Sequence, residues 1–222
     1  MDSNNIKNFT YSLGADVCGI GSIDRFKEAP KGFHPLDIYS EAKSVISVGK
    51  HFSASLFDAN TKAPYTFVKN KMVQLLDDIS IKLIFYIESQ GYKAIPIPSD
   101  EPYEYWDSEN QHGRGILSLK HAAQACGIGC IGKNTLLINE KYGNRLYFGA
   151  VITNMELISD ALANNLCTES CNICLKSCPQ SALDGITINQ KKCRQACINS
   201  TPGGGFIYSC YTCRKVCPFS KI

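Results

Sequence analysis

Nine of the twelve cysteines in this 222-residue chain lie after residue 166, and their spacing constrains the fold more than any other feature. The first run reads C-x3-C-x2-C-x3-C-P and comprises Cys167, Cys171, Cys174, Cys178 and Pro179. The second run is Cys193 followed by C-x2-C-x3-C-P, which comprises Cys210, Cys213, Cys217 and Pro218. The repeated ending C-x2-C-x3-C-P is typical of ferredoxins that hold two iron–sulfur clusters. This end of the chain is therefore predicted to bind metal through thiolates.

Swapped ligation is the arrangement that this repeat predicts. Three closely spaced thiolates bind one cluster, and the proline turns the chain away, so that the fourth thiolate binds the other cluster. The first cluster would then be held by Cys167, Cys171, Cys174 and Cys217. The second would be held by Cys178, Cys193, Cys210 and Cys213, with Cys197 as an alternative to Cys193. Structural zinc competes with this interpretation, but zinc sites use paired C-x2-C knuckles and need no third thiolate before a proline. We predict two [4Fe–4S] clusters.

Basic residues gather at the same end of the chain. From Cys167 onward there are seven basic residues against two acidic ones, a net of +5, while the rest of the chain carries −2. A thiolate-ligated cluster is negatively charged, and nearby cations stabilise it and raise its reduction potential. A solvated basic face is the alternative, and cations this dispersed are weak evidence for a nucleic-acid surface.

The composition is that of a packed globular protein, with 44% hydrophobic and 19% charged residues. No apolar run reaches the roughly 18–20 residues that span a bilayer. The N-terminus MDSNNIKNFT lacks the basic and apolar regions of a signal peptide. We therefore expect a cytoplasmic protein, in which cysteines at short spacing bind metal more often than they form disulfides.

Helices and strands alternate before the cysteine runs. Helices are expected at 5–14, from Pro64 to Gly91 and at 116–126, and strands at 16–23, 44–52, 92–98 and, as two strands joined near Tyr142, within 134–153. The segment 99–116 is expected to be a loop. After about residue 160 this pattern gives way to cysteines, glycines and short turns. We predict an α/β cofactor-binding domain over 1–160 and a ferredoxin-like domain over 161–222.

The stretch GIGCIG (127–132) matches the dinucleotide fingerprint G-x-G-x-x-G in the wrong context. That fingerprint needs a strand before it and a helix after it, whereas here a helix precedes and the strand-like NTLLI follows. The glycines are better explained as a loop that approaches a ligand or neighbouring backbone closely. Cys126 and Cys130, which flank this loop, are interpreted as small buried hydrophobic residues.

The segment HAAQACGIGCIGKNTLLINEKYGNRLYFGAVITNMEL (121–157), followed by the two cysteine runs, resembles the epoxyqueuosine reductase family, which is related to the reductive dehalogenases. EAKSVISVGKHF (41–52) resembles the upstream domain of the same family. The resemblance implies a nitroreductase-like α/β sandwich that binds base-off cobalamin against a ferredoxin-like domain, with one cluster reducing the corrinoid. By position it implies a cofactor-binding loop of Gly129, Ile131, Gly132, Lys133, Asn134 and Thr135.

Two departures from the family shape the expected activity. The family's V-D-[ST]-A-P-like segment, which carries its proposed proton donor, is replaced here by SDEPYEYWDSENQHGRG (99–115). Candidate donors in this segment are Asp100, Glu104, Tyr105 and Asp107, with Glu101 and Tyr103 beside them. Full-length members continue into helical repeats that help to hold tRNA, whereas this chain stops four residues after Pro218. It resembles a short member, and this difference argues against tRNA as its substrate.

Three functions follow from these observations. The first is a corrinoid-dependent iron–sulfur reductase that takes electrons from a ferredoxin or flavodoxin and reduces a small molecule or a corrinoid protein. The second is an electron-transfer or corrinoid-reducing partner with no turnover of its own. The third is a flavin-binding reductase, because nitroreductase-like domains often hold FMN. The acids and aromatic residues of 99–115 distinguish an enzyme from a carrier, unless they only cover the domain junction.

Overall fold

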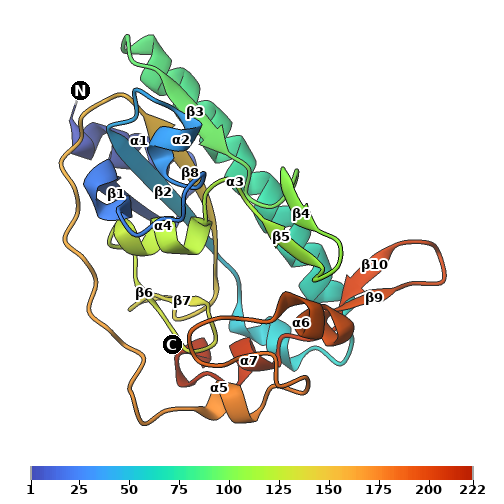
Figure 1. Cartoon of the computed structure of the whole chain (residues 1–222). Coiled ribbons are helices and arrows are strands. Elements are labelled where there is room, and N and C mark those ends of the chain that lie inside the picture. The colour runs from blue at the N-terminus through green and yellow to red at the C-terminus, as the bar shows by residue number, and fades with distance from the viewer. Residues whose placement is uncertain (1, 222) are drawn as a thin grey trace.

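The computed structural model describes residues 2–221, with the side chain of residue 221 left out, and has the mixed α/β architecture of Figure 1. The α-helices are α1 (Ser3–Ser12), α2 (Pro35–Ile38), α3 (Ala63–Ser89), α4 (Leu119–Ala125), α5 (Ile173–Lys176), α6 (Gln190–Cys197) and α7 (Thr212–Lys215). Short 3-10 helices cover Ile23–Phe26, Ala54–Asp58 and Pro218–Lys221. No helix among residues 2–221 is both long enough and apolar enough to span a membrane.

A four-stranded antiparallel sheet forms the centre of the molecule, in the order β1 (Val17–Ser22), β2 (Ser44–His51), β8 (Leu146–Thr153) and β3 (Ala94–Ile97). Three two-stranded ribbons surround it: β4 (Tyr105–Asp107) with β5 (His112–Arg114), β6 (Cys130–Ile131) with β7 (Leu137–Ile138), and β9 (Ile198–Ser200) with β10 (Phe206–Tyr208). The predicted mixed α/β fold is confirmed, and its main sheet is antiparallel.

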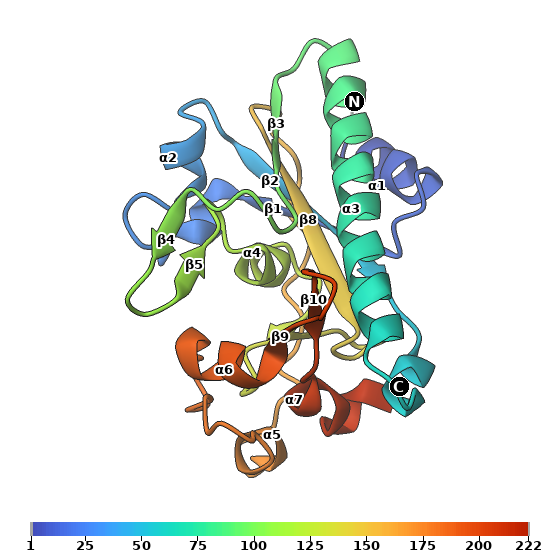
Figure 2. The ribbon, with the colours of Figure 1, turned by 90° about the vertical axis from the view of Figure 1, so that its right-hand side faces the viewer.

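Helices cover both faces of this sheet, as Figure 2 shows, with α1 and α3 on one side and α2 and α4 on the other. Ile46 and Val48 of β2 pack beneath α3, whereas Val45 on the same strand packs beneath α4. Successive strand residues point to opposite faces, so both sets are apolar and the central strands read as continuous hydrophobic runs. Burial of this apolar surface is the main stabilising contribution to the domain.

The long helix α3 follows directly from its sequence. Pro64 stands in its first turn, where its missing N–H costs nothing, and Gly91 ends it with a φ of +84°. Leu76, Leu83 and Ile87 are fully buried along one face. Spacing of three and four residues between apolar positions places them on one side of the helix, which explains why this element was predictable.

The two strands predicted within 134–153, joined by a turn near Tyr142, are present as β7 and β8, but they do not pair with each other. The strand β7 pairs with β6, and β8 belongs to the central sheet. Gly129 permits this, because a Cβ atom at that position would lie 2.3 Å from the carbonyl oxygen of Ile138. Segment 99–116, expected to be a loop, contains the β4–β5 ribbon. Both differences concern pairings that a single strand's pattern does not specify.

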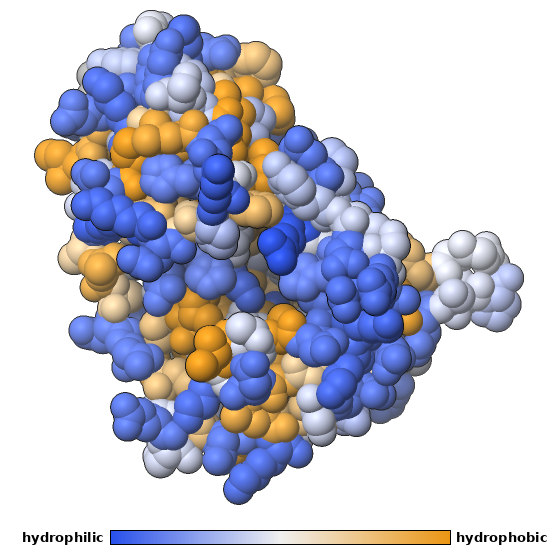
Figure 3. All heavy atoms as spheres, viewed as in Figure 1, coloured by the Kyte–Doolittle hydropathy of each residue, from blue (hydrophilic) through white to orange (hydrophobic). Residues whose placement is uncertain are grey.

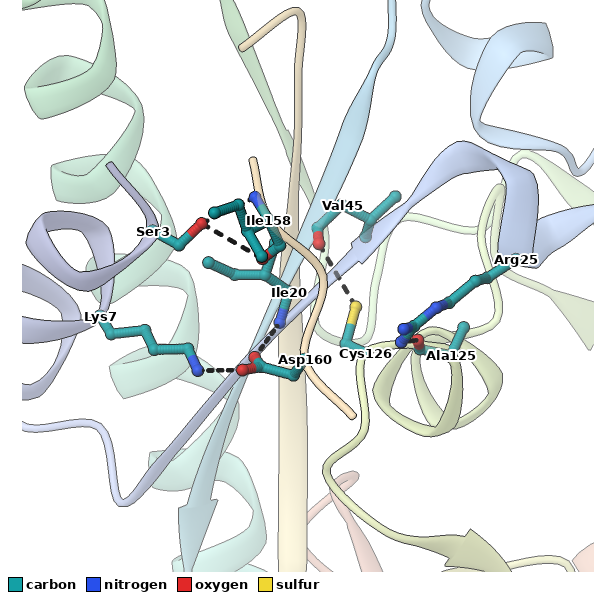
Figure 4. A network of polar contacts seen from close by, with 9 residues as sticks. All are labelled: Ser3, Lys7, Ile20, Arg25, Val45, Ala125, Cys126, Ile158 and Asp160. Atoms are coloured by element: carbon teal, nitrogen blue, oxygen red, sulfur yellow. Dashed lines mark hydrogen bonds and ion pairs between the residues drawn. The ribbon is translucent and has the colours of Figure 1, made fainter. Parts of the chain in front are cut away.

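An extended segment after β8 connects the sheet to the cysteine-rich region and includes residue 160, the predicted end of the first domain. Figure 4 shows it crossing beside β1, where the Asp160 carboxylate accepts hydrogen bonds from Lys7 Nζ and from the backbone N–H of Ile20. The backbone N–H of Asp160 in turn donates to the carbonyl oxygen of Ile20 over 2.9 Å. These contacts hold the connection against the free edge of the sheet and fix where the cysteine runs begin.

Candidate cluster-binding site

Four cysteines from the two runs line one cavity of about 220 Å³: Cys167, Cys171, Cys174 and Cys217. Burial raises the pKa of Cys217, and its three neighbours in the cavity raise it further by repelling its thiolate. The helix α5 presents Cys174, and the turn after α7 presents Cys217. The structure thus brings together the set predicted for the first cluster, including the ligand from the second run.

The remaining five cysteines form a second group of Cys178, Cys193, Cys197, Cys210 and Cys213. Burial raises the pKa of Cys213 to about 11, with repulsion from Cys193, Cys210 and Cys178 adding to it. Cys193 and Cys197 stand one turn apart on α6, and their thiols are hydrogen-bonded to each other. Cys197 Sγ also donates to the carbonyl oxygen of Cys210 over 3.4 Å. Both α6 thiols therefore adjoin the rest of the group, and the choice between them stays open.

The sulfur atoms have the surroundings that thiolate ligands of a cluster require. All twelve cysteines are free thiols. The Cys167 sulfur accepts a hydrogen bond from the backbone N–H of Lys133 over 3.5 Å, and the Cys178 sulfur accepts one from Ala182 over 3.3 Å. Hydrogen bonds of this kind set the reduction potential of a cluster.

A single metal ion fits this arrangement less well than a cluster. Within residues 2–221, no three His, Cys, Asp or Glu side chains converge as they would around one ion. A four-iron cluster takes one thiolate at each iron, so its four sulfurs stand apart with the cluster between them. The four cysteines of the first group line one cavity of about 220 Å³, in keeping with this prediction.

The loop predicted to bind a cofactor contacts both cysteine groups. Lys133 Nζ donates to the carbonyl oxygens of Glu169 and Cys171 over 2.5 and 3.0 Å. Asn134 is buried, and its Nδ2 donates to the carbonyl oxygen of Cys213 over 3.1 Å. Thr135 turns the chain with a φ of +58°. The loop therefore forms one wall of the first cavity.

The size of that cavity bears on the predicted corrinoid. At about 220 Å³ it is below the roughly 300–1,000 Å³ of small-molecule sites, so it suits a cluster and not a corrin ring. Gly129 and Gly132 face Ile138 within the β6–β7 ribbon instead of an open cavity. The loop residues named for the corrinoid therefore do not enclose a corrin by themselves. The GIGCIG stretch follows α4 and enters β6, so the predicted context of a helix before and a strand after it is confirmed.

The candidate proton donors separate into two sets. Asp100 forms an ion pair with Lys69 of α3 and accepts a hydrogen bond from the Tyr103 hydroxyl over 3.4 Å. Glu104, Tyr105 and Asp107 lie exposed on the β4–β5 ribbon and the residue before it. The Tyr105 ring packs on Phe33, and the Asp107 carboxylate accepts two hydrogen bonds from Asn110. Of these four candidates, Asp100 is the one whose ion-pair partner, Lys69, also contacts the cysteine-rich half, at Tyr208 of β10, in the junction between the two halves of the molecule.

Residues near the second cysteine group complete this junction. Lys69 Nζ lies 4.8 Å from the ring centroid of Tyr208 in β10, and the Arg194 guanidinium lies 4.9 Å from the Trp106 ring. Burial raises the pKa of Tyr103, and the nearby Asp100 raises it further. Hydrophilic residues cover the α6 region on the face shown in Figure 3. No sequence pattern identified Lys69, Arg194 or Tyr208, because their partners are distant in the chain.

The prediction that Cys126 and Cys130 are small buried residues is confirmed, and Cys18 of β1 is buried as well. Cys126 Sγ donates to the carbonyl oxygen of Val45 over 3.3 Å, on the face of the sheet covered by α4 (Figure 4). Burial raises the pKa of Cys18 to about 12. Burial raises the pKa of Cys126 as well, so neither Cys18 nor Cys126 readily forms the thiolate that would act as a nucleophile.

Comparison with known proteins adds sequence relatives. No protein-family model matches the chain. Epoxyqueuosine reductase of Listeria monocytogenes is 37% identical over 123 residues, which is 48% of this chain and 31% of that protein. The enzyme of Bacillus subtilis is 32% identical over 118 residues, or 48% of this chain and 30% of that protein. The match thus spans about a third of the length of these curated relatives.

Solved structures share the fold over nearly the whole chain. Epoxyqueuosine reductase from Streptococcus thermophilus has a TM-score of 0.69 at 21% identity, covering 99% of this chain and 66% of that one. A catabolic reductive dehalogenase in complex with 3-bromo-4-hydroxybenzoic acid has a TM-score of 0.70 at 18% identity, covering 98% and 31%. The chain is therefore related in sequence to the epoxyqueuosine reductases, and it shares its fold with them and with the reductive dehalogenases.

Proposed function

We propose that this protein is an iron–sulfur oxidoreductase that passes electrons through two [4Fe–4S] clusters to a corrinoid and a substrate. The observation that carries the proposal is the exchange of cysteines between the two runs, with Cys217 beside the first run and Cys178 beside the second. This exchange brings the two groups close together, as electron transfer between clusters requires. The relatedness to epoxyqueuosine reductases supports the reductase class.

The surroundings of the two groups support a direction for the electrons. Ile173, which is 45% exposed, lies beside the first cavity, so a reduced ferredoxin or flavodoxin has access to that side. The second group adjoins Arg194, Trp106 and the Asp100 junction. We propose that electrons enter at the first cluster and leave from the second.

Asp100 is the candidate acid–base residue that this arrangement favours: its carboxylate, paired with Lys69, would take up a proton before it donates one to the reacting group. Its carboxyl group is held in the junction by Lys69 and Tyr103, while Glu104, Tyr105 and Asp107 face solvent. A general acid must lie within hydrogen-bond reach of the reacting group, and a positioned acid contributes about 10²–10⁴-fold to the rate. We therefore expect Asp100→Asn to lower turnover by about 100-fold or more, and Glu104→Gln to lower it less than threefold.

Two substrate classes are open to test. The expectation of a small molecule in place of tRNA rested on where the chain ends, and the comparisons do not support it. An epoxyqueuosine reductase solved with an epoxyqueuosine-modified tRNA stem loop covers 98% of this chain at a TM-score of 0.66. Such a stem loop is therefore the first substrate to assay, followed by halogenated phenolic acids.

Anaerobic reconstitution tests the proposal. The reconstituted protein should hold about eight irons per chain if both clusters are four-iron. It is then incubated with hydroxocobalamin and FMN, passed through gel filtration and examined by absorption spectroscopy. If the protein retains corrin absorption and reduces the epoxyqueuosine of the stem loop, the full proposal is supported. If it holds two clusters but retains no corrin and turns over no substrate, the proposal is excluded.

A second function has its own observation in support. The loop 129–135 contacts the cysteine groups and does not enclose a corrin-sized cavity. This arrangement favours an electron-transfer or corrinoid-reducing partner, which holds two clusters and reduces another protein. Such a partner would reduce a corrinoid protein in solution without retaining corrin itself, and retained FMN would favour the third function, a flavin reductase.

A further inference from the structure

Arg214 of α7 is buried between the second cysteine group and the central sheet. Its side chain is only 8% exposed, and it directly follows Cys213. The guanidinium donates to the carbonyl oxygen of Asn144, and Asn144 Nδ2 donates back to the carbonyl oxygen of Arg214 over 3.0 Å. Its Cζ atom lies 5.2 Å from the ring centroids of both Phe52 and Tyr147. The cation is thus held in a fixed position by partners on the α/β side.

Within residues 2–221, the ion pairs do not include Arg214, so no described carboxylate neutralises this cation. A carbonyl oxygen and two aromatic rings stabilise a guanidinium, but they carry no negative charge. Buried charges in proteins are paired or lie beside metal sites, because leaving a charge unpaired in the interior costs several kcal/mol. A counter-charge is therefore expected nearby.

The second cysteine group adjoins this cation. Cys213, a proposed ligand of the second cluster, directly precedes the buried Arg214 on α7. A cluster ligated by thiolates is negatively charged, and its reduction by one electron adds a further negative charge. A buried cation stabilises that added charge strongly, because neither water nor salt screens the interaction.

We propose that Arg214 is the buried counter-charge of the second cluster and raises its reduction potential, a role that rests on the cluster-binding function proposed above. Arg214 is a positioning and redox-tuning residue and touches no substrate. Because Asn144, Phe52 and Tyr147 belong to the α/β half, it also ties the potential of this cluster to the docking of the two halves. At the first group, Lys133 is only partly buried, reaches the Cys167 sulfur through its backbone N–H, and donates its ammonium hydrogens to carbonyl oxygens.

The test compares reconstituted full-length wild type with Arg214→Gln, Arg214→Lys and Lys215→Gln. Each protein is first shown to contain about eight irons, which checks the cluster function separately from the role of Arg214. Anaerobic titration with dithionite, which supplies the electrons, is followed by electron paramagnetic resonance of the reduced clusters. Lys215 is the matched control, because it is the next residue of the same helix and is exposed to solvent.

For Arg214→Gln we expect the ratio of reduced to oxidised second cluster at a given potential to fall about tenfold. A tenfold change in this ratio corresponds to a shift of about 59 mV in the reduction potential of a one-electron couple. The amount of reduced first cluster at that potential should change by less than threefold in Arg214→Gln. In Lys215→Gln the amounts of both reduced clusters should change by less than threefold. Arg214→Lys keeps the charge, so its amount of reduced second cluster should stay within threefold of wild type. An unchanged second cluster in Arg214→Gln, or an equal shift in Lys215→Gln, would overturn the proposal.

If Arg214→Gln does not hold its second cluster, the Arg214→Lys variant still tests whether the charge at position 214 sets the reduction potential. An Arg214→Lys protein with eight irons and a potential near that of wild type shows that the charge is what matters. An Arg214→Lys protein with a shifted potential or only one cluster would show that the guanidinium's hydrogen bonds and ring contacts hold the site, and the proposal would be wrong.

Discussion

The two cysteine groups share a sequence motif but differ in what surrounds them. The first lies around a cavity between α5, the 129–135 loop and the end of the chain, with Ile173 exposed at its side. The second lies against the α/β half, between buried Arg214 and the α6 helix that carries Arg194 over Trp106. The same ligand spacing thus yields one site near solvent and one at the junction. Spacing therefore predicts the ligands, while the surrounding fold makes the two predicted sites different.

The largest expected effect comes from pairs of cysteine substitutions that test the exchange itself. In swapped ligation Cys171 and Cys217 serve the same cluster, so Cys171→Ser/Cys217→Ser should retain about four irons. Cys171 and Cys178 serve different clusters, so Cys171→Ser/Cys178→Ser should retain almost none, although both lie in one run. Iron analysis after anaerobic reconstitution distinguishes these results, and the opposite ranking would mean that each run binds its own cluster.

The second group has five thiols, one more than a four-iron cluster needs, whereas the first group has four. Cys193 and Cys197 both adjoin its other members. We expect one of the variants Cys193→Ser and Cys197→Ser to fall from about eight irons to about four, and the other to remain near eight. Equal loss in both variants would show that the hydrogen bond between the two thiols, and not ligation by one of them, maintains the site.

A smaller effect is expected from Lys133, whose contacts are confined to the first group. Its ammonium donates to Glu169 and Cys171, and each such charged hydrogen bond contributes about 1.5–3 kcal/mol at most. Lys133→Met should release iron from the first cluster to a chelator several-fold faster and leave the second unchanged. Lys176→Met is the control, since Lys176 is exposed on α5 and its backbone N–H, which bonds the carbonyl oxygen of Asn172, is unchanged by the substitution. Equal release from both clusters would contradict this assignment.

The smallest effect is a pH dependence on the side of the second group. Burial alone would lower the pKa of Lys69, but its bond to Asp100 and its contact with Tyr208 outweigh burial and raise it. A raised lysine pKa stabilises the fold below the unfolded value of about 10.4 and loses this contribution as pH rises through the folded pKa. Urea unfolding should place Lys69→Met about 0.5–1 kcal/mol below wild type at pH 8. The gap should shrink above pH 11, and a constant gap would show that the lysine acts by packing alone.

Much of the candidate site was predictable because cluster ligation depends on local spacing. The C-x2-C-x3-C-P repeats assign thiolates to two groups without reference to the rest of the chain. The sequence did not reduce the candidate proton donors to one residue. Asp100 and Asp107 look equivalent in the sequence, but Lys69, which lies 31 residues before Asp100, draws only the former into the junction.

The sequence by itself determined the two cysteine groups, the buried strands of the sheet and the long helix α3, because each depends on a short repeating pattern. Only the tertiary structure decided that Asn134 contacts Cys213 and that Arg214 contacts Asn144, across 79 and 70 residues of chain. Such contacts arise when separate surfaces pack together, and no local pattern records which surfaces will meet. The environment of each cluster, and with it the proposed path of the electrons, is therefore a property of the folded chain.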